Sequence, residues 1–96
     1  MGYLSKVAAG GSTVFPSIGL SSNPEKGSAI FWENTKAAGY RHIHALHGGC
    51  PVLVGSKWIF NKWIRSHDQA MQHKCGLNTD DSINLLDFFR KTNSKY

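Results

Sequence analysis

The sequence predicts a mostly β fold, a barrel or sandwich of short strands followed by one helix near the C-terminus. Three observations predict it. Glycine, proline, serine and asparagine divide residues 1–75 into short segments, β-prone side chains fill the segments between them, and helical spacing occurs only near the end of the chain. The length of 96 residues and the hydrophobic content of 41% suit one small globular domain or part of a larger one.

Four segments have the composition of strands. The first stops at Pro16, which cannot donate a hydrogen bond to a sheet, and a looser alternation runs over residues 42–47. Residues 17–28 form a polar connection with a turn at residues 24–27, and residues 33–41 form a loop around Gly39. The four predicted strands are residues 12–15, 28–32, 50–54 and 57–64.

A helix is predicted over residues 81–91. Thr79 or Asp80 is a suitable N-terminal cap, and Ile83 and Leu86 share one helical face. A sheet of four or five strands leaves open edges, and the three tryptophans and five phenylalanines need a second layer to pack against. The chain is therefore expected to be part of a sandwich rather than a whole one.

The net charge is +5, from eleven Lys and Arg against six Asp and Glu. Lys57, Lys62 and Arg65 lie close together in the sequence, with aromatic residues between them. Such a cluster fits an acidic small molecule, a nucleic acid, or a solvated basic surface without a ligand. Charge by itself leaves these three alternatives open.

Membrane insertion and secretion have no signal in this sequence. No run approaches the ~18 apolar residues of a membrane span. Lys6 and the pair Gly10 and Gly11 interrupt the opening residues, so no signal peptide is predicted. Cys50 and Cys75 are compatible with free thiols, metal ligands or one disulfide, and their spacing does not decide among these.

Two stretches carry a family resemblance. The first is Gly11-x-Thr13-x-Phe15-Pro16-x-x-Gly19, followed by Pro24-x-x-Gly27-x-Ala29-x-Phe31-Trp32. The second is His47-x-x-Cys50-Pro51-Val52-Leu53-x-Gly55-x-Lys57-Trp58, continuing to Asn61-Lys62-Trp63-Ile64. In this order they resemble the collagen prolyl 4-hydroxylase alpha subunit. The resemblance implies that residues 1–75 are the C-terminal half of an Fe(II)/2-oxoglutarate dioxygenase domain, a partial double-stranded β-helix (jelly-roll), and that residues 76–96 form a separate tail.

The resemblance also assigns roles to residues. The family holds Fe(II) with two histidines and one carboxylate, leaving positions open for 2-oxoglutarate and O2. His47 matches the second histidine, and Lys57 matches the basic residue that binds the far carboxylate of 2-oxoglutarate. Thr13 and Arg65 are further candidates for contacts with this cosubstrate. Arg65 replaces a histidine of the family and, unlike histidine, cannot lose its proton near neutral pH.

The implied reaction is 4-hydroxylation of proline in collagen-like polypeptides, with ascorbate keeping the iron reduced and protein disulfide isomerase as partner subunit. The positions of Cys50 and Cys75 match an intrachain disulfide of the family, which implies the lumen of the endoplasmic reticulum. No His-x-Asp or His-x-Glu occurs in the 96 residues, so the first two iron ligands of the family have no match. The chain therefore resembles a truncated dioxygenase that is expected to be inactive by itself.

Two alternatives to an enzyme segment follow from the same residues. The chain is either a non-catalytic remnant that acts as a binding or interaction fragment, or a zinc protein whose ligands are His44, His47, Cys50 and Cys75. The zinc hypothesis leaves Lys57 unexplained. A nucleic-acid module is not expected, because the barrel already accounts for its aromatic and basic residues.

Overall fold

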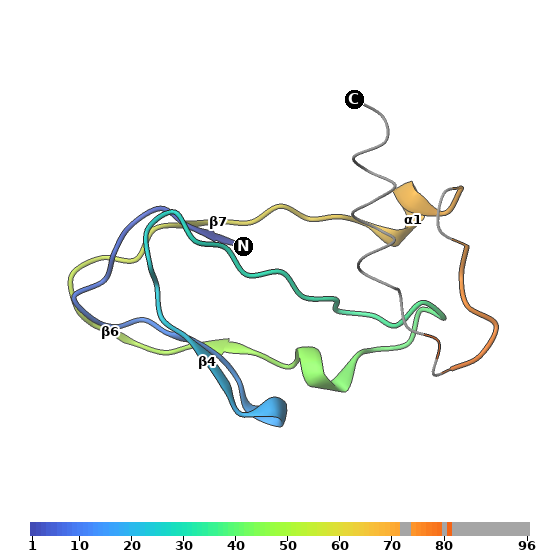
Figure 1. The fold of residues 1–96 in the computed structure, drawn as a ribbon, viewed down its shortest axis with the longest axis horizontal. Helices are drawn as coiled ribbons and strands as arrows, with labels where there is room; N and C mark the ends of the chain where they lie inside the picture. The colour runs from blue at the N-terminus through green and yellow to red at the C-terminus, as the bar shows by residue number, and fades with distance from the viewer. Residues whose placement is uncertain (72–73, 80, 82–96) are drawn as a thin grey trace. The chain divides into compact units, whose positions relative to one another are not determined.

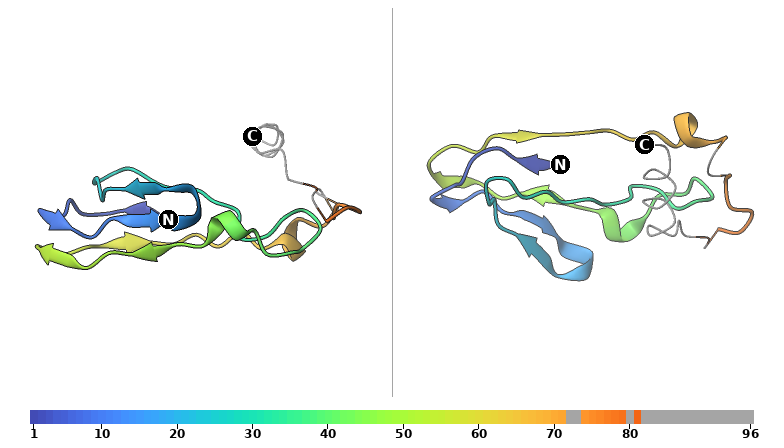
Figure 2. Two further views of the ribbon diagram at one scale, coloured as in Figure 1. Left: turned by 90° about the horizontal axis from the view of Figure 1, so that it is seen from below. Right: turned by 45° about the horizontal axis from the view of Figure 1, so that its top comes forward.

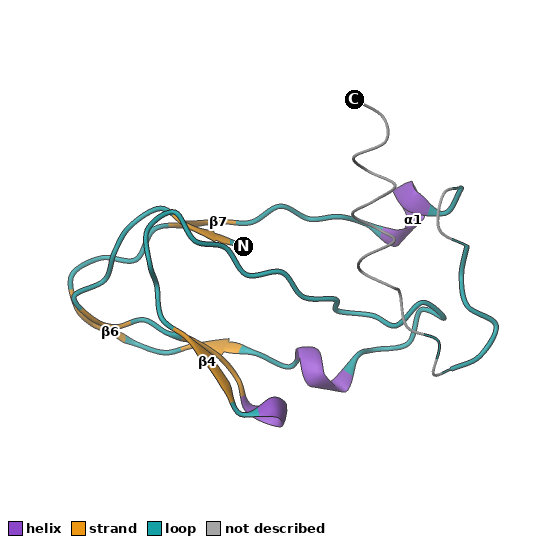
Figure 3. Ribbon diagram, in the orientation of Figure 1, coloured by secondary structure: helices purple, strands orange, loops and turns teal. Residues whose placement is uncertain are grey.

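The computed structural model describes residues 1–71, 74–79 and 81. These residues form two units, one of Met1–Asn34 with His42–Arg65, the other of Thr35–Arg41 with the described residues from Ser66 onwards. Most of the described chain is loop, with short strands between (Figures 1 and 3). The elements are β1 (Gly2–Tyr3), β2 (Ala9–Gly10), β3 (Thr13–Phe15), the 3-10 helix Pro16–Ile18, β4 (Leu20–Ser22), the 3-10 helix Ile43–Ala45, β5 (Gly48–Gly49), β6 (Val52–Val54), β7 (Ile59–Phe60) and α1 (Ser66–Gln69).

Three small antiparallel sheets make up the first unit. Strand β1 pairs with β7, β2 pairs with β6, and β3 lies between β4 and β5. Both views in Figure 2 show strands from the first part of the chain beside strands from the second part. The N-terminal strands are therefore held by partners that lie far away in the sequence.

Several predicted elements are confirmed. The segment over residues 12–15 forms β3, and the segment over residues 50–54 contributes β6. The predicted turn is present, because the Ser28 amide donates to the Glu25 carbonyl at 3.1 Å. The prediction of a mostly β chain is confirmed by the described residues, while the jelly-roll stays a prediction.

Two predicted strands are wrong over most of their length. Residues 57–64 pair only at Ile59–Phe60, because their partner β1 has only two residues. Residues 28–32 form no strand and contribute a single bridge, from Ala29 to Gly2. Strand residues need a partner for their backbone groups, so the short β1 limits both of its neighbours.

Several elements were not expected, and two of them change the interpretation of a predicted segment. Leu20–Ser22 forms β4 inside the predicted polar connection, where it completes a hairpin with β3. Gly19 closes this hairpin at φ +64°, a conformation that glycine adopts readily. The loose alternation over residues 42–47 is a 3-10 turn at Ile43–Ala45 instead, with the Ala45 amide donating to the His42 carbonyl at 3.0 Å.

The core of the first unit is small. Its most buried side chains are Tyr3, at 1% exposure, and Phe15 and Thr13, at 3% each. Many large apolar side chains remain exposed, among them Leu4, Leu53, Trp58, Phe60 and Trp63. These side chains are exposed among the described residues, and the expectation of part of a sandwich stays a prediction.

The second unit contains a turn and one short helix. The Lys36 amide donates to the Tyr40 carbonyl at 2.8 Å, and a bridge joins Thr35 to Arg41. Apart from its first residue, Asp81, the predicted helix over residues 81–91 lies outside the described residues, and the division at residue 75 stays a prediction. No helix in the described ranges is both long and apolar enough to cross a membrane.

Candidate functional site

Thr13 is the centre of a buried polar contact on β3. Strand alternation directs Thr13 and Phe15 to the buried side of the unit. The Thr13 Oγ1 atom accepts a hydrogen bond from the Tyr3 hydroxyl at 2.9 Å, and Lys57 Nζ lies 3.4 Å from the same oxygen. A threonine hydroxyl has two lone pairs, so it can accept both bonds. Tyr3, Thr13 and Lys57 form what we call the lysine site.

The ammonium of Lys57 lies at the edge of the core. Its nitrogen lies 5.6 Å from the centroid of the Tyr3 ring, a cation–π distance. Its stem passes Gly11, and a Cβ atom at Gly49 would lie 3.9 Å from the nitrogen. The ammonium therefore reaches into the space opposite Thr13, at a point where strand β5 carries no side chain.

Lys57 forms no ion pair with any residue that the structure describes. The side chain is half-buried, so part of its charge has lost contact with water. A partly desolvated charge without a counter-charge favours the binding of an anion. The lysine site is thus suited to a carboxylate, with the Lys57 ammonium and the Thr13 hydroxyl as donors.

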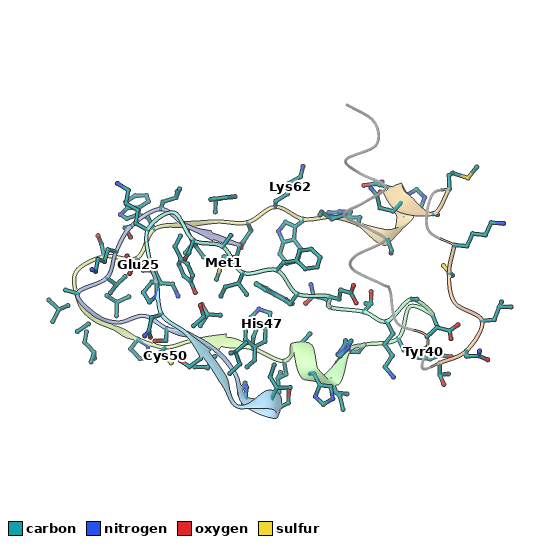
Figure 4. All side chains as sticks on the ribbon, in the orientation of Figure 1. Met1, Glu25, Tyr40, His47, Cys50 and Lys62 are labelled. Atoms are coloured by element: carbon teal, nitrogen blue, oxygen red, sulfur yellow. The ribbon has the colours of Figure 1, made fainter. Side chains whose placement is uncertain are left out.

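His47 lies between the second 3-10 turn and β5, and its ring points toward the segment that carries Trp32 (Figure 4). Its Nδ1 atom lies 2.7 Å from the Ala45 carbonyl oxygen. Because a carbonyl can only accept, Nδ1 must carry the hydrogen, and in the neutral ring the lone pair is then on Nε2. This is the usual arrangement of a metal-binding histidine, whose second nitrogen donates to a carbonyl.

The strand register relates His47 to Lys57. Thr13 is opposite Gly49 and Val14 is opposite Gly48, so His47 follows next, beside Phe15. His47 itself lies just before β5, which begins at Gly48. The imidazole and the ammonium both lie next to residues of β3, His47 beside Phe15 and Lys57 beside Thr13.

An iron centre would need more ligands than His47. Within the ranges that the structure describes, no three histidine, cysteine, aspartate or glutamate side chains come together as metal ligands. The proposed zinc group of His44, His47 and the cysteines is likewise not formed there. The residues present therefore do not fit a complete iron site, although His47 has the tautomer that one ligand requires.

The remaining predicted site residues are not among the three side chains of the lysine site. Arg65 is exposed at the end of the first unit. Cys50, half-buried, belongs to the first unit, whereas Cys75 is exposed and belongs to the second, and both are free thiols. Their disulfide stays a prediction, as do the roles given to His47, Lys57, Thr13 and Arg65.

Sequence reasoning missed Tyr3 and the packing of Trp32. Nothing in the sequence connects Tyr3 to Thr13, ten residues away, since the contact depends on how β1 crosses the buried side of β3. Next to Trp32, burial raises the pKa of the Glu33 carboxyl group, and the nearby His42 partly offsets this rise. Glu33 carries no role in the lysine site.

No protein-family model matches this chain. Individual proteins do match it, and all of those named here are prolyl 4-hydroxylase subunits. Human prolyl 4-hydroxylase subunit alpha-1 is 47% identical over 76 residues, which cover 79% of this chain and 14% of the human subunit. The chicken alpha-2 subunit is 43% identical over 76 residues, and the Caenorhabditis elegans alpha-2 subunit is 38% identical over 84 residues.

The proteins that this chain resembles are thus hydroxylase subunits. More specifically, the chain matches a segment of the prolyl 4-hydroxylase alpha subunits, and the resemblance seen in the sequence is confirmed. It spans about one seventh of the length of the human alpha-1 subunit, 14%.

Proposed function

We propose that this chain is the part of a prolyl 4-hydroxylase-like dioxygenase domain that binds 2-oxoglutarate and contributes one histidine to Fe(II). The observation that carries the proposal is the lysine site. A half-buried Lys57, which forms no ion pair with any described residue, donates to Thr13, and His47 packs against Phe15 of the same strand β3. The sequence relation to alpha subunits supports the same assignment.

In this proposal Lys57 binds the far carboxylate of 2-oxoglutarate as an ion pair. The Thr13 hydroxyl accepts a hydrogen bond from the ammonium and is itself held by the Tyr3 hydroxyl, which donates to it. His47, just before β5, would present Nε2 to the iron near the other end of the dicarboxylate. The two further iron ligands would come from residues outside this chain, so no catalytic step is assigned to the chain by itself.

The proposal includes the finer features that the family resemblance implies. The segment would belong to a jelly-roll domain in the lumen of the endoplasmic reticulum, where the complete enzyme would use Fe(II), O2 and ascorbate. Its substrate would be proline in a collagen-like polypeptide, and its partner subunit would be protein disulfide isomerase. The name of the relatives, prolyl 4-hydroxylase, supports a prolyl substrate.

Binding of 2-oxoglutarate tests the proposal directly. We expect NMR titration of the chain to shift the signals of Thr13 and Tyr3, and the shifts to disappear in Lys57→Met. Lys62→Met is the matched control, because Lys62 is an exposed lysine of the same segment and should leave binding intact. Equal loss of binding in both variants would show nonspecific attraction to a basic chain and would refute the lysine site.

Release of succinate tests the second half of the proposal. With Fe(II), ascorbate and a proline-rich peptide, the chain by itself should release none, because the described residues contain no group of three metal ligands. Steady turnover would contradict this conclusion. Absence of both turnover and 2-oxoglutarate binding would favour the interaction fragment instead.

A further inference from the structure

Beside the lysine site, three aromatic rings meet in the first unit. Phe15 and Trp32 pack edge to face, with ring centroids 5.5 Å apart and an interplanar angle of 71°. The His47 ring lies 4.6 Å from Trp32 and 5.4 Å from Phe15. Each ring thus contacts the other two, within the distances at which aromatic pairs attract.

The imidazole is held from a second direction by its own backbone. The 3-10 turn at Ile43–Ala45 places the Ala45 carbonyl 2.7 Å from Nδ1. Trp32 is itself fixed, because its indole Nε1–H donates to Asn34 Oδ1 at 3.0 Å. The ring of His47 therefore has packing partners on β3 and near Trp32, and one hydrogen-bond partner on the turn.

From this arrangement we infer that Phe15 and Trp32 are positioning residues, which hold His47 with its hydrogen on Nδ1 and its lone pair on Nε2 in the metal-free chain. The inference rests on the proposed role of His47 as a ligand. The contacts confine the ring to the orientation in which Nδ1 faces Ala45. A donor fixed before its partner arrives loses less conformational freedom on binding.

The physical reason that packing selects a tautomer is competition with water. His47 is exposed, so a freely rotating ring would exchange its carbonyl partner for solvent. Free neutral imidazole side chains in water prefer the hydrogen on Nε2. Only a ring that remains near the Ala45 carbonyl gains the hydrogen bond that reverses this preference.

The test is the tautomer of His47 in the complete chain without metal, measured by long-range ¹H–¹⁵N NMR above the pH at which imidazole is protonated. His47→Gln identifies the signals among those of the five histidines. We expect the wild-type chain to show Nδ1–H at His47, with cross-relaxation between its ring protons and the Trp32 indole. Wild-type spectra that show mainly Nε2–H, or no contact to the indole, overturn the inference.

Substitution separates positioning from general stability. In Trp32→Ala and in Trp32→Leu the ratio of Nδ1–H to Nε2–H at His47 should fall by about two- to tenfold, the equivalent of one aromatic contact. The matched control is Trp63→Ala, which removes an exposed tryptophan of the same unit, at 68% exposure, and should leave the ratio unchanged. An unchanged ratio in folded Trp32→Leu overturns the inference. No cosubstrate is present, so the result is independent of whether the chain binds 2-oxoglutarate.

Discussion

Replacing Thr13 by valine tests the lysine site through stability. Valine keeps the shape of threonine but removes Oγ1, which accepts from the Tyr3 hydroxyl at 2.9 Å. Tyr3 is 1% exposed, so water cannot replace the lost acceptor. A buried donor left without a partner costs about 1–3 kcal/mol. Thr13→Val should therefore lower the free energy of unfolding by that amount, and Tm by about 4–8 °C for each kcal/mol.

A double-mutant cycle gives the sharper result. Tyr3→Phe removes the donor itself, leaves Thr13 with its contact to Lys57, and should cost less, about 0.5–1.5 kcal/mol. In the double variant no buried hydroxyl lacks its partner, so the loss should be smaller than the sum of the two single losses. Urea unfolding followed by tryptophan fluorescence measures all four chains. Strict additivity, or no loss in Thr13→Val, would refute the buried hydrogen bond and the geometry built on it.

Three further predictions concern other parts of the chain. Gly10→Ala should lower Tm more than Gly19→Ala. Both glycines have positive φ, +78° and +64°, but only at Gly10 would the new Cβ atom overlap a backbone carbonyl. Equal losses of Tm in the two variants would argue against that contact. Burial raises the pKa of Glu33 above 4.5 in the folded chain, so the folded chain holds the proton more tightly and this stabilisation is lost as the pH rises through the folded pKa. Glu33→Gln should therefore raise Tm at neutral pH and bring no such gain well below pH 4.5; a gain that is the same at both pH values would exclude this titration as its cause. Mild oxidation should remove the thiols of Cys50 and Cys75 together without forming dimers, as measured by thiol titration and gel filtration, whereas loss of only one thiol or dimer formation would contradict the intrachain disulfide.

Local sequence predicted those elements whose signals are local. Strand β3 follows from β-prone residues stopped by Pro16, and the turn at residues 24–27 follows from proline and glycine. The strand predictions that were wrong concern segments whose structure depends on a pairing strand elsewhere in the chain. Residues 57–64 have the composition of a strand, yet only Ile59–Phe60 finds the backbone of β1. Pairing over a separation of more than fifty residues cannot be deduced from the composition of one segment.

Prediction of the candidate site from the sequence was limited in the same way, because it depends on contacts between distant residues. The family motifs predicted His47 and Lys57 as site residues, and the structure identifies the side chains and backbone groups that contact them. Tyr3 had no signal, since its hydroxyl becomes meaningful only when β1 brings it to Thr13. The 3-10 turn before His47 was also unexpected, although it supplies the carbonyl that fixes the imidazole. The residues that position a functional group were therefore harder to predict than the group itself.

The lysine site and the histidine differ in how much of each this chain contains. All three side chains of the lysine site come from the first unit, and their hydrogen bonds close within it. His47, by contrast, has its packing partners here but no second or third metal ligand among the described residues. The proposed binding of a carboxylate can therefore be tested separately from the proposed binding of iron. If the chain binds 2-oxoglutarate through Lys57 but holds no iron, recognition of the cosubstrate is a local property of these strands, and the chemistry of hydroxylation depends on ligands supplied from elsewhere.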